Sequence, residues 1–324
     1  LYIRSDGSAS YTFYDVDASH SIRATFQRGT EIPDFGPVVG EVYISIENNT
    51  YWGGDFTGTL ASGWYDLCAE DTMMTIVLKA LALDGYSWWG TGASDTGGYD
   101  ITYLSGIYMD KNGNGRRDNS EPSLAEFDGS RGAGWMGTLN DWFVNEGFQS
   151  FRVGGRGTYE LADGDYLNIV FTQNLGEDVG SLWGNSDTSL EDPHISGGSL
   201  APRFDGDTLE YTLSITGNSA RVTVTPTAVN KNYMVKTFLN RYNRDSAFYK
   251  RTESITVKPG DILYIGVGDP SWPSMNNQST EAIDYEGTKY TITVVNGNSA
   301  EAVIGMIKAV PEITYANYKT QASK

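Results

Sequence analysis

The strongest chemical signal in the chain is a run of twelve residues, 110–121, which reads Asp-Lys-Asn-Gly-Asn-Gly-Arg-Arg-Asp-Asn-Ser-Glu. Its first, third, fifth, ninth and twelfth positions carry side-chain oxygens, from Asp110, Asn112, Asn114, Asp118 and Glu121. Gly115 fills the sixth position, where the chain must turn sharply, and the seventh offers the main-chain carbonyl of Arg116. Calcium takes six to eight oxygen ligands, so this spacing predicts a structural Ca²⁺ site.

The residues on either side of this run indicate which kind of loop it forms. A helical EF-hand places amphipathic helices on both sides, but residues 100–109 are rich in β-branched and aromatic types, and Pro122 follows directly. We therefore expect a metal-holding loop between two strands, structural rather than catalytic or sensory. The alternative is an ordinary surface turn, because Asn, Gly and Asp dominate turns in general.

Composition argues against several classes of function. The 324 residues carry a formal net charge of −18, so nucleic acids and anionic membranes would repel the chain. The single cysteine, Cys68, cannot form an internal disulfide, and we expect it in a core. Neither histidine lies near a nucleophile-elbow pattern, and there is no phosphate-cradling loop. No run approaches the ~18 apolar residues that a membrane span needs.

Three tryptophans are candidates for ligand binding. Trp88 and Trp89 lie in a Gly-, Ser- and Thr-rich stretch, and Trp272 lies between Ser271 and Pro273. Exposed indole rings in loops are platforms on which sugar rings stack, so these three predict a glycan-binding surface. The alternative is that the rings cap hydrophobic cores from loops.

A second group of acidic residues lies near the middle of the chain. Asp163 and Asp165, with Asp178 downstream, could form a paired-carboxylate site for glycoside hydrolysis or a second calcium site. Asp-Gly-Asp is first of all a hairpin turn, however, and paired acids are common in so acidic a chain. We therefore expect no enzyme activity.

The elements that must position these residues are mostly strands. Thirty-eight glycines with abundant Tyr, Thr, Val and Ile predict many short strands joined by tight turns. One strong helix is expected at 73–83, capped by Asp71 and Thr72 and ended by Gly85. The fold class is thus mainly β with one helix in the first large domain, followed by a β-sandwich.

Three stretches resemble domains of bacterial surface proteins. Residues 1–30 resemble half of an internalin-type repeat through Tyr11, Phe13, Val16, His20, Ile22 and Phe26. After a linker at 31–39, residues 40–185 resemble the domains related to the C-terminal domain of transcobalamin, through Gly134, Trp135, Met136, Leu139, Asn140, Gly164, Asp165, Thr172, Leu175, Gly176 and Asp178. That resemblance implies an α+β fold, and the loop at 110–121 is an insertion similar to the calcium loops of serine-aspartate-repeat adhesins.

The rest of the chain carries the third resemblance. Residues 194–297 resemble cadherin-like β-sandwich domains, through Gly198, Leu200, Pro202, Phe204, Tyr211, Val222, Val224, Pro226, Gly260, Asp261, Tyr290, Ile292 and Val294. An aromatic insertion at 269–277 is unusual for such a domain. Residues 298–324 resemble the start of a helical module, so we expect the chain to be part of something longer.

Together these resemblances imply a non-catalytic segment of a large secreted or cell-surface bacterial protein, extracellular and stabilised by Ca²⁺. Its expected role is adhesion, ligand display or spacing as a stalk, with a surface glycan or protein as partner and neither nucleic acid nor membrane insertion. The alternatives are a glycan- or corrinoid-binding module and a self-assembling extracellular fibre subunit. The corrinoid is implied only by the transcobalamin resemblance.

Overall fold

The computed structural model separates the chain into two compact units. It describes residues 2–3, 9–10, 32–92, 98–244, 247–251, 253–278 and 285–297. Unit 1 comprises residues 1–187 with two later segments, 230–234 and 270–285, and unit 2 comprises residues 188–229, 235–269 and 286–324. The expected modules at 1–30 and 298–324 lie almost wholly outside the described residues.

Unit 1 is organised around a seven-stranded sheet in the order β2-β1-β4-β3-β10-β8-β9. Its strands are β1 (Tyr2–Ile3), β2 (Ala9–Ser10), β3 (Val38–Asn48), β4 (Gly58–Cys68), β8 (Gly134–Leu139), β9 (Trp142–Phe143) and β10 (Tyr166–Thr172). Side chains alternate along β3, so Val42, Ile44 and Ile46 are fully buried while the residues between them are not. This alternation fixes the register of β3 against β10, with which it pairs in parallel.

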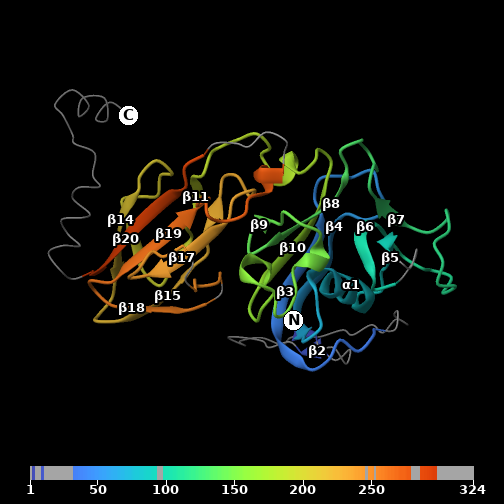
Figure 1. Ribbon diagram of the computed structural model, residues 1–324, viewed down its shortest axis with the longest axis horizontal. Coiled ribbons are helices and arrows are strands. Elements are labelled where there is room, and N and C mark those ends of the chain that lie inside the picture. The colour runs from blue at the N-terminus through green and yellow to red at the C-terminus, as the bar shows by residue number, and fades with distance from the viewer. Residues whose placement is uncertain are drawn as a thin grey trace, which may run out of the picture. The chain divides into compact units, whose positions relative to one another are not determined.

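The only α-helix among the described residues is α1 (Met73–Leu83), which packs against β4 and β3 (Figure 1). Thr72 is its N-cap, in a capping box with Thr75, and Gly85 follows its C-cap with a φ of +81°. The helix therefore starts and stops as its sequence predicts. It is buried around most of its circumference, however, rather than along one face.

A lysine is part of this buried helix. Lys79 is 3% exposed, and its Nζ lies 2.5 Å from Oδ2 of Asp71, a fully buried residue. Asp71 also accepts hydrogen bonds from the Cys68 main-chain N–H at 2.7 Å and from the Thr75 hydroxyl at 2.9 Å. The ion pair thus ties the helix to the end of β4, and Cys68 is buried beside it as expected.

A three-stranded sheet in the order β5-β6-β7 completes the β structure of unit 1. It consists of β5 (Ser87–Gly92), β6 (Ile101–Tyr108) and β7 (Ser123–Ala125), all antiparallel. Short 3-10 turns connect other parts of the unit: η1 (Phe148–Ser150), η2 (Gly157–Tyr159), η3 (Glu177–Val179) and η4 (Met275–Gln278).

The two later segments of unit 1 are held by a network of buried amides. Asn232 is fully buried; its Oδ1 accepts from the Ser181 hydroxyl at 2.6 Å, and its Nδ2 donates to Oδ1 of Asn276 at 2.6 Å. The indole N–H of Trp142 donates to the Asn232 carbonyl at 3.1 Å. Residues 269–277 are expected as an insertion in the sandwich, but the contacts of 270–277 group them with unit 1.

Asn232→Ala is expected to lower the free energy of unfolding of unit 1 by about 3 kcal/mol, because it deprives two buried polar partners of a hydrogen bond. Urea denaturation followed by tryptophan fluorescence measures this, since all eight tryptophans of the chain lie in unit 1. The exposed Asn49→Ala is the matched control and should change stability by less than ~0.5 kcal/mol. Equal midpoints for the two variants would contradict the role of the network.

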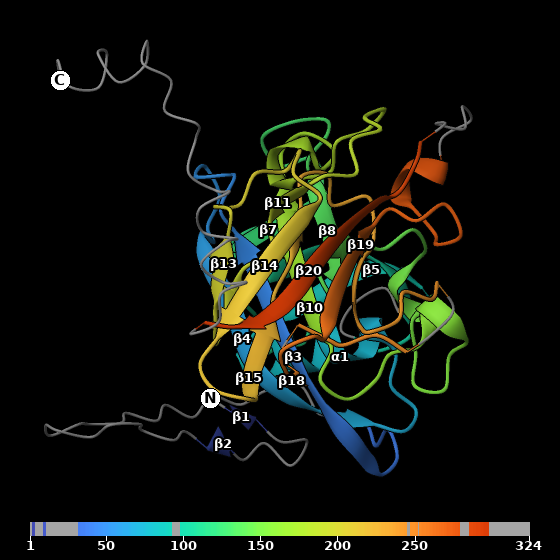
Figure 2. The same cartoon turned by 90° about the vertical axis from the view of Figure 1, so that its left-hand side faces the viewer.

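Unit 2 is built from short strands in three sheets. A five-stranded sheet has the order β13-β14-β20-β19-β17, a three-stranded sheet β12-β15-β18, and a two-stranded sheet β11-β16. Figures 1 and 2 show β14, β20 and β19 side by side. The strands are β11 (Leu190–Asp192), β12 (Ile195–Ser196), β13 (Ser199–Ala201), β14 (Glu210–Ile215), β15 (Ala220–Val224), β16 (Thr227–Ala228), β17 (Val235–Leu239), β18 (Ile255–Val257), β19 (Ile262–Val267) and β20 (Thr288–Asn296).

The core of unit 2 lies among the inward-facing residues of these strands. Leu213, Val257, Ile265 and Val294 come from four different strands in two sheets and are fully buried. Along β14 and β20, alternation sends the intervening side chains outward. The expected fold class, mainly β with one helix and a β-sandwich, is confirmed.

Candidate metal centre

The twelve-residue loop joins two antiparallel strands, as its flanking residues predict. Residues 110–121 connect β6 to β7, and Tyr108 pairs with Ser123 at the base of the loop. The Met109 N–H donates to the Pro122 carbonyl at 3.0 Å, which brings the two ends together. The loop is thus held at both ends by a sheet rather than by helices.

Asp110, at the first position, gathers the first half of the loop. Its Oδ1 accepts from the main-chain N–H groups of Gly113 at 2.7 Å and Asn114 at 3.2 Å, and its Oδ2 accepts from Gly115 at 2.7 Å. Gly113 and Gly115 have φ values of +69° and +71°, which side chains other than that of glycine rarely adopt. The two glycines therefore let the chain curl around the Asp110 carboxylate.

The middle of the loop consists of successive Asx turns. Asn112 Oδ1 accepts from the Asn114 N–H at 3.0 Å, and Asn114 Oδ1 accepts from the Arg116 N–H at 2.7 Å. Asp118 Oδ1 accepts from both the hydroxyl and the N–H of Ser120, and these hydrogen bonds hold the pKa of the Asp118 carboxyl below its usual value. Asp118 is therefore ionised at neutral pH.

Glu121, at the twelfth position, closes the loop. It is only 6% exposed, and its two oxygens accept from the N–H groups of Lys111 at 3.1 Å and Asp118 at 3.2 Å. Within the described part of the chain, no lysine or arginine forms an ion pair with it. A buried carboxylate without a cationic partner is unfavourable unless a cation binds beside it.

The donor set fits a hard cation. All five side chains offer oxygen, the ligand type that calcium prefers, and the Arg116 carbonyl could supply a sixth. Among the described residues, no group of three or more His, Cys, Asp and Glu side chains forms a metal-holding cluster. The loop would instead rely on asparagine and main-chain oxygens as well as on its carboxylates.

Trp89 contacts this loop rather than solvent alone. The guanidinium carbon of Arg117 lies 3.9 Å from the centre of the indole ring, and Tyr108 lies on β6 with its ring centroid 6.0 Å away. Trp89 is half-buried and belongs to strand β5, not to a loop. The ring is thus partly covered by a cation–π contact, which links the loop to the sheet beneath it.

The expectation that the other two tryptophans are exposed is wrong. Trp88 is fully buried on β5, where its indole N–H donates to the Gly98 carbonyl at 2.9 Å. Trp272 is 4% exposed. Neither ring can serve as a platform for a sugar, because a pyranose needs an accessible indole face.

The carboxylates near the middle of the chain hold turns together. Asp163 Oδ1 accepts from the Glu41 N–H at 2.8 Å, and Asp165 accepts from the Ala162 N–H at 2.8 Å and from the Asn140 amide at 2.9 Å. Asp178 accepts from the Gln173 N–H at 2.8 Å. Each acid therefore has a structural role in shaping the main chain, and the structure adds no observation that favours hydrolysis.

One part of the chain is similar to a known family. Residues 186–297 match the cadherin-like beta sandwich domain. The match covers unit 2 as far as residue 297, together with the two segments of unit 1 at 230–234 and 270–285. It starts eight residues before the expected boundary at 194. No curated protein and no solved structure matches the chain.

The cadherin-like domain constrains the function. It is a non-catalytic fold, typical of extracellular proteins, and it fits an adhesion or stalk-type module. None of the helices in the described ranges is long and apolar enough to cross a membrane. The resemblances of residues 1–30 and 40–185 to other surface domains stay predictions.

Proposed function

We propose that this chain is a non-catalytic, Ca²⁺-stabilised segment of an extracellular bacterial surface protein, acting in adhesion, ligand display or as a stalk. The observation that carries the proposal is the loop at 110–121, in which hydrogen bonds from main-chain N–H groups fix the carboxylates of Asp110 and Glu121, the first and twelfth positions. The cadherin-like domain supports an extracellular setting, in which calcium is plentiful.

The residues that would hold the ion are Asp110, Asn112, Asn114, Arg116 through its carbonyl, Asp118 and Glu121. When bound, the ion would neutralise the carboxylates of Asp110, Asp118 and Glu121 and cross-link the two halves of the loop. Because the loop joins β6 to β7, this would stiffen the three-stranded sheet of unit 1. A stiff sheet suits a module that transmits force or presents a ligand.

Calcium is expected to protect the loop from proteolysis. Lys111 is exposed at the second position of the loop, so a lysine-specific protease that needs no calcium should cut there at least tenfold more slowly with Ca²⁺ than with chelator. Lys250, which lies outside the strands of unit 2 and is not followed by proline, provides an internal reference whose cleavage rate should not change. Mass spectrometry of the fragments measures both rates.

Glu121→Gln is the matched variant for this experiment, since it keeps the shape of the side chain and removes its charge. The Glu121→Gln variant should be cleaved at Lys111 at the same fast rate in Ca²⁺ and in chelator. Equal rates at Lys111 with and without calcium in the unmodified chain would refute the proposed ion site.

A further inference from the structure

Unit 1 contains two neighbouring cavities that share a wall. The smaller has a volume of about 210 Å³ and the larger about 470 Å³, and both are lined by Tyr103, Trp135, Met136 and Met275. We call them the inner and the outer cavity. Neither includes a residue of the calcium loop.

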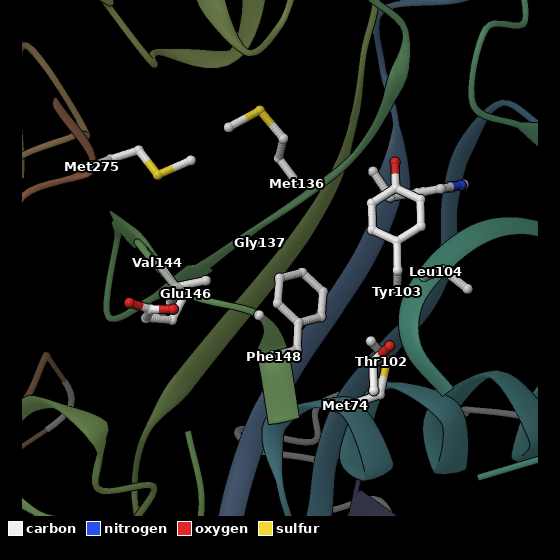
Figure 3. Close-up of a pocket in the computed structure, with 12 residues that line it drawn as sticks. Met74, Thr102, Tyr103, Leu104, Met136, Gly137, Val144, Glu146, Phe148 and Met275 are labelled. Atoms are coloured by element: carbon white, nitrogen blue, oxygen red, sulfur yellow. The ribbon is translucent and has the colours of Figure 1, made fainter. Parts of the chain in front are cut away.

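The inner cavity is apolar and adaptable. Figure 3 shows its walls, with the ring of Phe148 between Tyr103 and Val144, and with Met136, Met275 and Met74 around it. Thioether side chains are flexible and polarisable, so they adjust to apolar groups of different shapes. Sugar-binding sites, in contrast, need several polar groups aimed at hydroxyls, and this wall offers few.

Exposed apolar side chains gather at the outer cavity. Seven large hydrophobic residues are exposed in the part of the chain that the structure describes, and three of them line this cavity: Tyr103 at 45%, Phe127 at 66% and Leu175 at 64%. Their concentration at one place indicates a surface that is covered by a partner.

Two of these residues are held in an unusual backbone conformation. Phe127 and Leu175 have φ values of +68° and +51°, in the left-handed region that large side chains rarely adopt. Their N–H groups donate to the carbonyls of Ala133 at 3.0 Å and Gly132 at 2.9 Å, which fixes them on either side of one loop. Backbone strain that displays apolar side chains to solvent points to a binding role.

The shared wall also contains a polar atom without a partner. Trp135 is 7% exposed, and its indole Nε1 makes no hydrogen bond with any described residue. This nitrogen can only donate, so its partner must offer an acceptor. The nitrogen itself is buried beneath the cavity wall, so a ligand in the cavities would not reach it unless the surrounding side chains moved.

Acidic side chains surround the two cavities. Glu126 and Glu177 line the outer cavity and Glu146 the inner one, against one cation, Arg131. None of the three glutamates forms an ion pair in the described part of the chain. Glu126 accepts from the Tyr103 hydroxyl at 2.9 Å, and burial together with this hydrogen bond raises the pKa of Tyr103 to about 12. The Tyr103 hydroxyl therefore stays protonated at neutral pH and donates to Glu126. The excess of glutamates around the two cavities favours a partner with basic residues.

We propose that the two cavities bind a polypeptide segment of a partner protein, with an apolar side chain in the inner cavity and flanking basic residues at the glutamates. This inference rests on the proposed role in adhesion or ligand display and names the surface and the class of partner. It does not require the ion to contact the partner.

The test uses the full chain in Ca²⁺ on an array of ten-residue peptides. One position of each peptide varies among apolar residues, and its neighbours are Lys, Ser or Glu. We expect the strongest binding for an apolar residue flanked by lysines, with at least a tenfold preference over glutamate-flanked peptides that weakens as salt is raised. A glycan array under the same conditions should give no signal.

Variants connect the binding to the named residues. Phe127→Asn combined with Leu175→Asn removes the two most exposed apolar side chains of the outer cavity and keeps a residue type that tolerates a positive φ, so it should weaken binding about tenfold. Trp52→Asn, at an exposed tryptophan outside both cavities, should not. Glu126→Gln combined with Glu177→Gln should abolish the preference for lysine.

Each contrary outcome has a separate meaning. Absence of peptide binding, binding that Phe127→Asn combined with Leu175→Asn leaves unchanged, or binding to glycans instead would overturn this inference. If the same chain still shows calcium-dependent protection at Lys111, the proposed function survives. Conversely, peptide binding in a chain without such protection would leave this inference standing and remove the ion from the proposed function.

Discussion

Asp71→Ala is expected to lower the free energy of unfolding of unit 1 by about 3–5 kcal/mol. The change leaves the ammonium of Lys79 buried at 3% exposure with no carboxylate beside it. It also removes the acceptor for the Cys68 N–H and the Thr75 hydroxyl. A buried charge that loses its partner costs more than the net contribution of the intact pair, so this loss should exceed that of most single substitutions.

Tryptophan fluorescence in a urea titration measures the effect, because it reports unit 1 alone. The double variant Lys79→Met with Asp71→Asn is the control. Its two residues carry no charge, and the introduced amide would still offer an oxygen to the Cys68 N–H. The double variant should be more stable than Asp71→Ala by at least ~2 kcal/mol. If the two are equally unstable, the buried charge is not the cause.

The helix and the turns of the loop at 110–121 could be predicted because their signals are local. Thr72 and Gly85 cap and end the helix through hydrogen bonds and φ values set within a few residues. Gly113 and Gly115 likewise shape the loop through contacts with Asp110 alone. Residues close in sequence determine the ends of the helix and the turns of the loop, so both could be predicted from the sequence.

The environments of Lys79 and Trp88 depend on distant residues. Lys79 lies on an otherwise apolar helix, and its burial depends on Asp71, two turns away on the preceding segment. The Gly- and Ser-rich neighbours of Trp88 favour a loop, but pairing with β6 makes the segment a strand, with Trp88 on its buried face. A single charged residue in an apolar helix is the signal that could have identified the ion pair.

Contacts between residues far apart in the sequence could not be predicted from the sequence. The segments at 230–234 and 270–285 join unit 1 through Asn232 and Asn276, which follow it in sequence by tens of residues. Likewise, the cavities at Trp135 combine residues from β6, β8, η1 and η4. Neither arrangement leaves a periodic pattern in the sequence.

Removal of calcium is expected to lower the stability of unit 1, and this is the second large effect that we predict. An ion that binds only the folded state stabilises it by RT ln(1 + [L]/Kd), which is about 2.7 kcal/mol at a hundred times Kd. For a unit of this size, that corresponds to about 5–10 °C in the midpoint of thermal unfolding. Magnesium should stabilise less, since it demands six near-ideal octahedral ligands and gives up its water reluctantly.

Variants of the loop should separate the ion from its scaffold. Asp110→Ala and Glu121→Ala remove ligands from the first and twelfth positions, so each should unfold at the same temperature with calcium and with chelator. Asp100→Ala replaces an exposed carboxylate outside the loop and should keep the full calcium response.

The most direct test is the thermal unfolding of the unmodified chain in millimolar Ca²⁺ and in excess chelator, followed by tryptophan fluorescence. The proposed calcium site predicts a midpoint about 5–10 °C higher with calcium, and no difference for Asp110→Ala. Superimposed curves for the unmodified chain would contradict it.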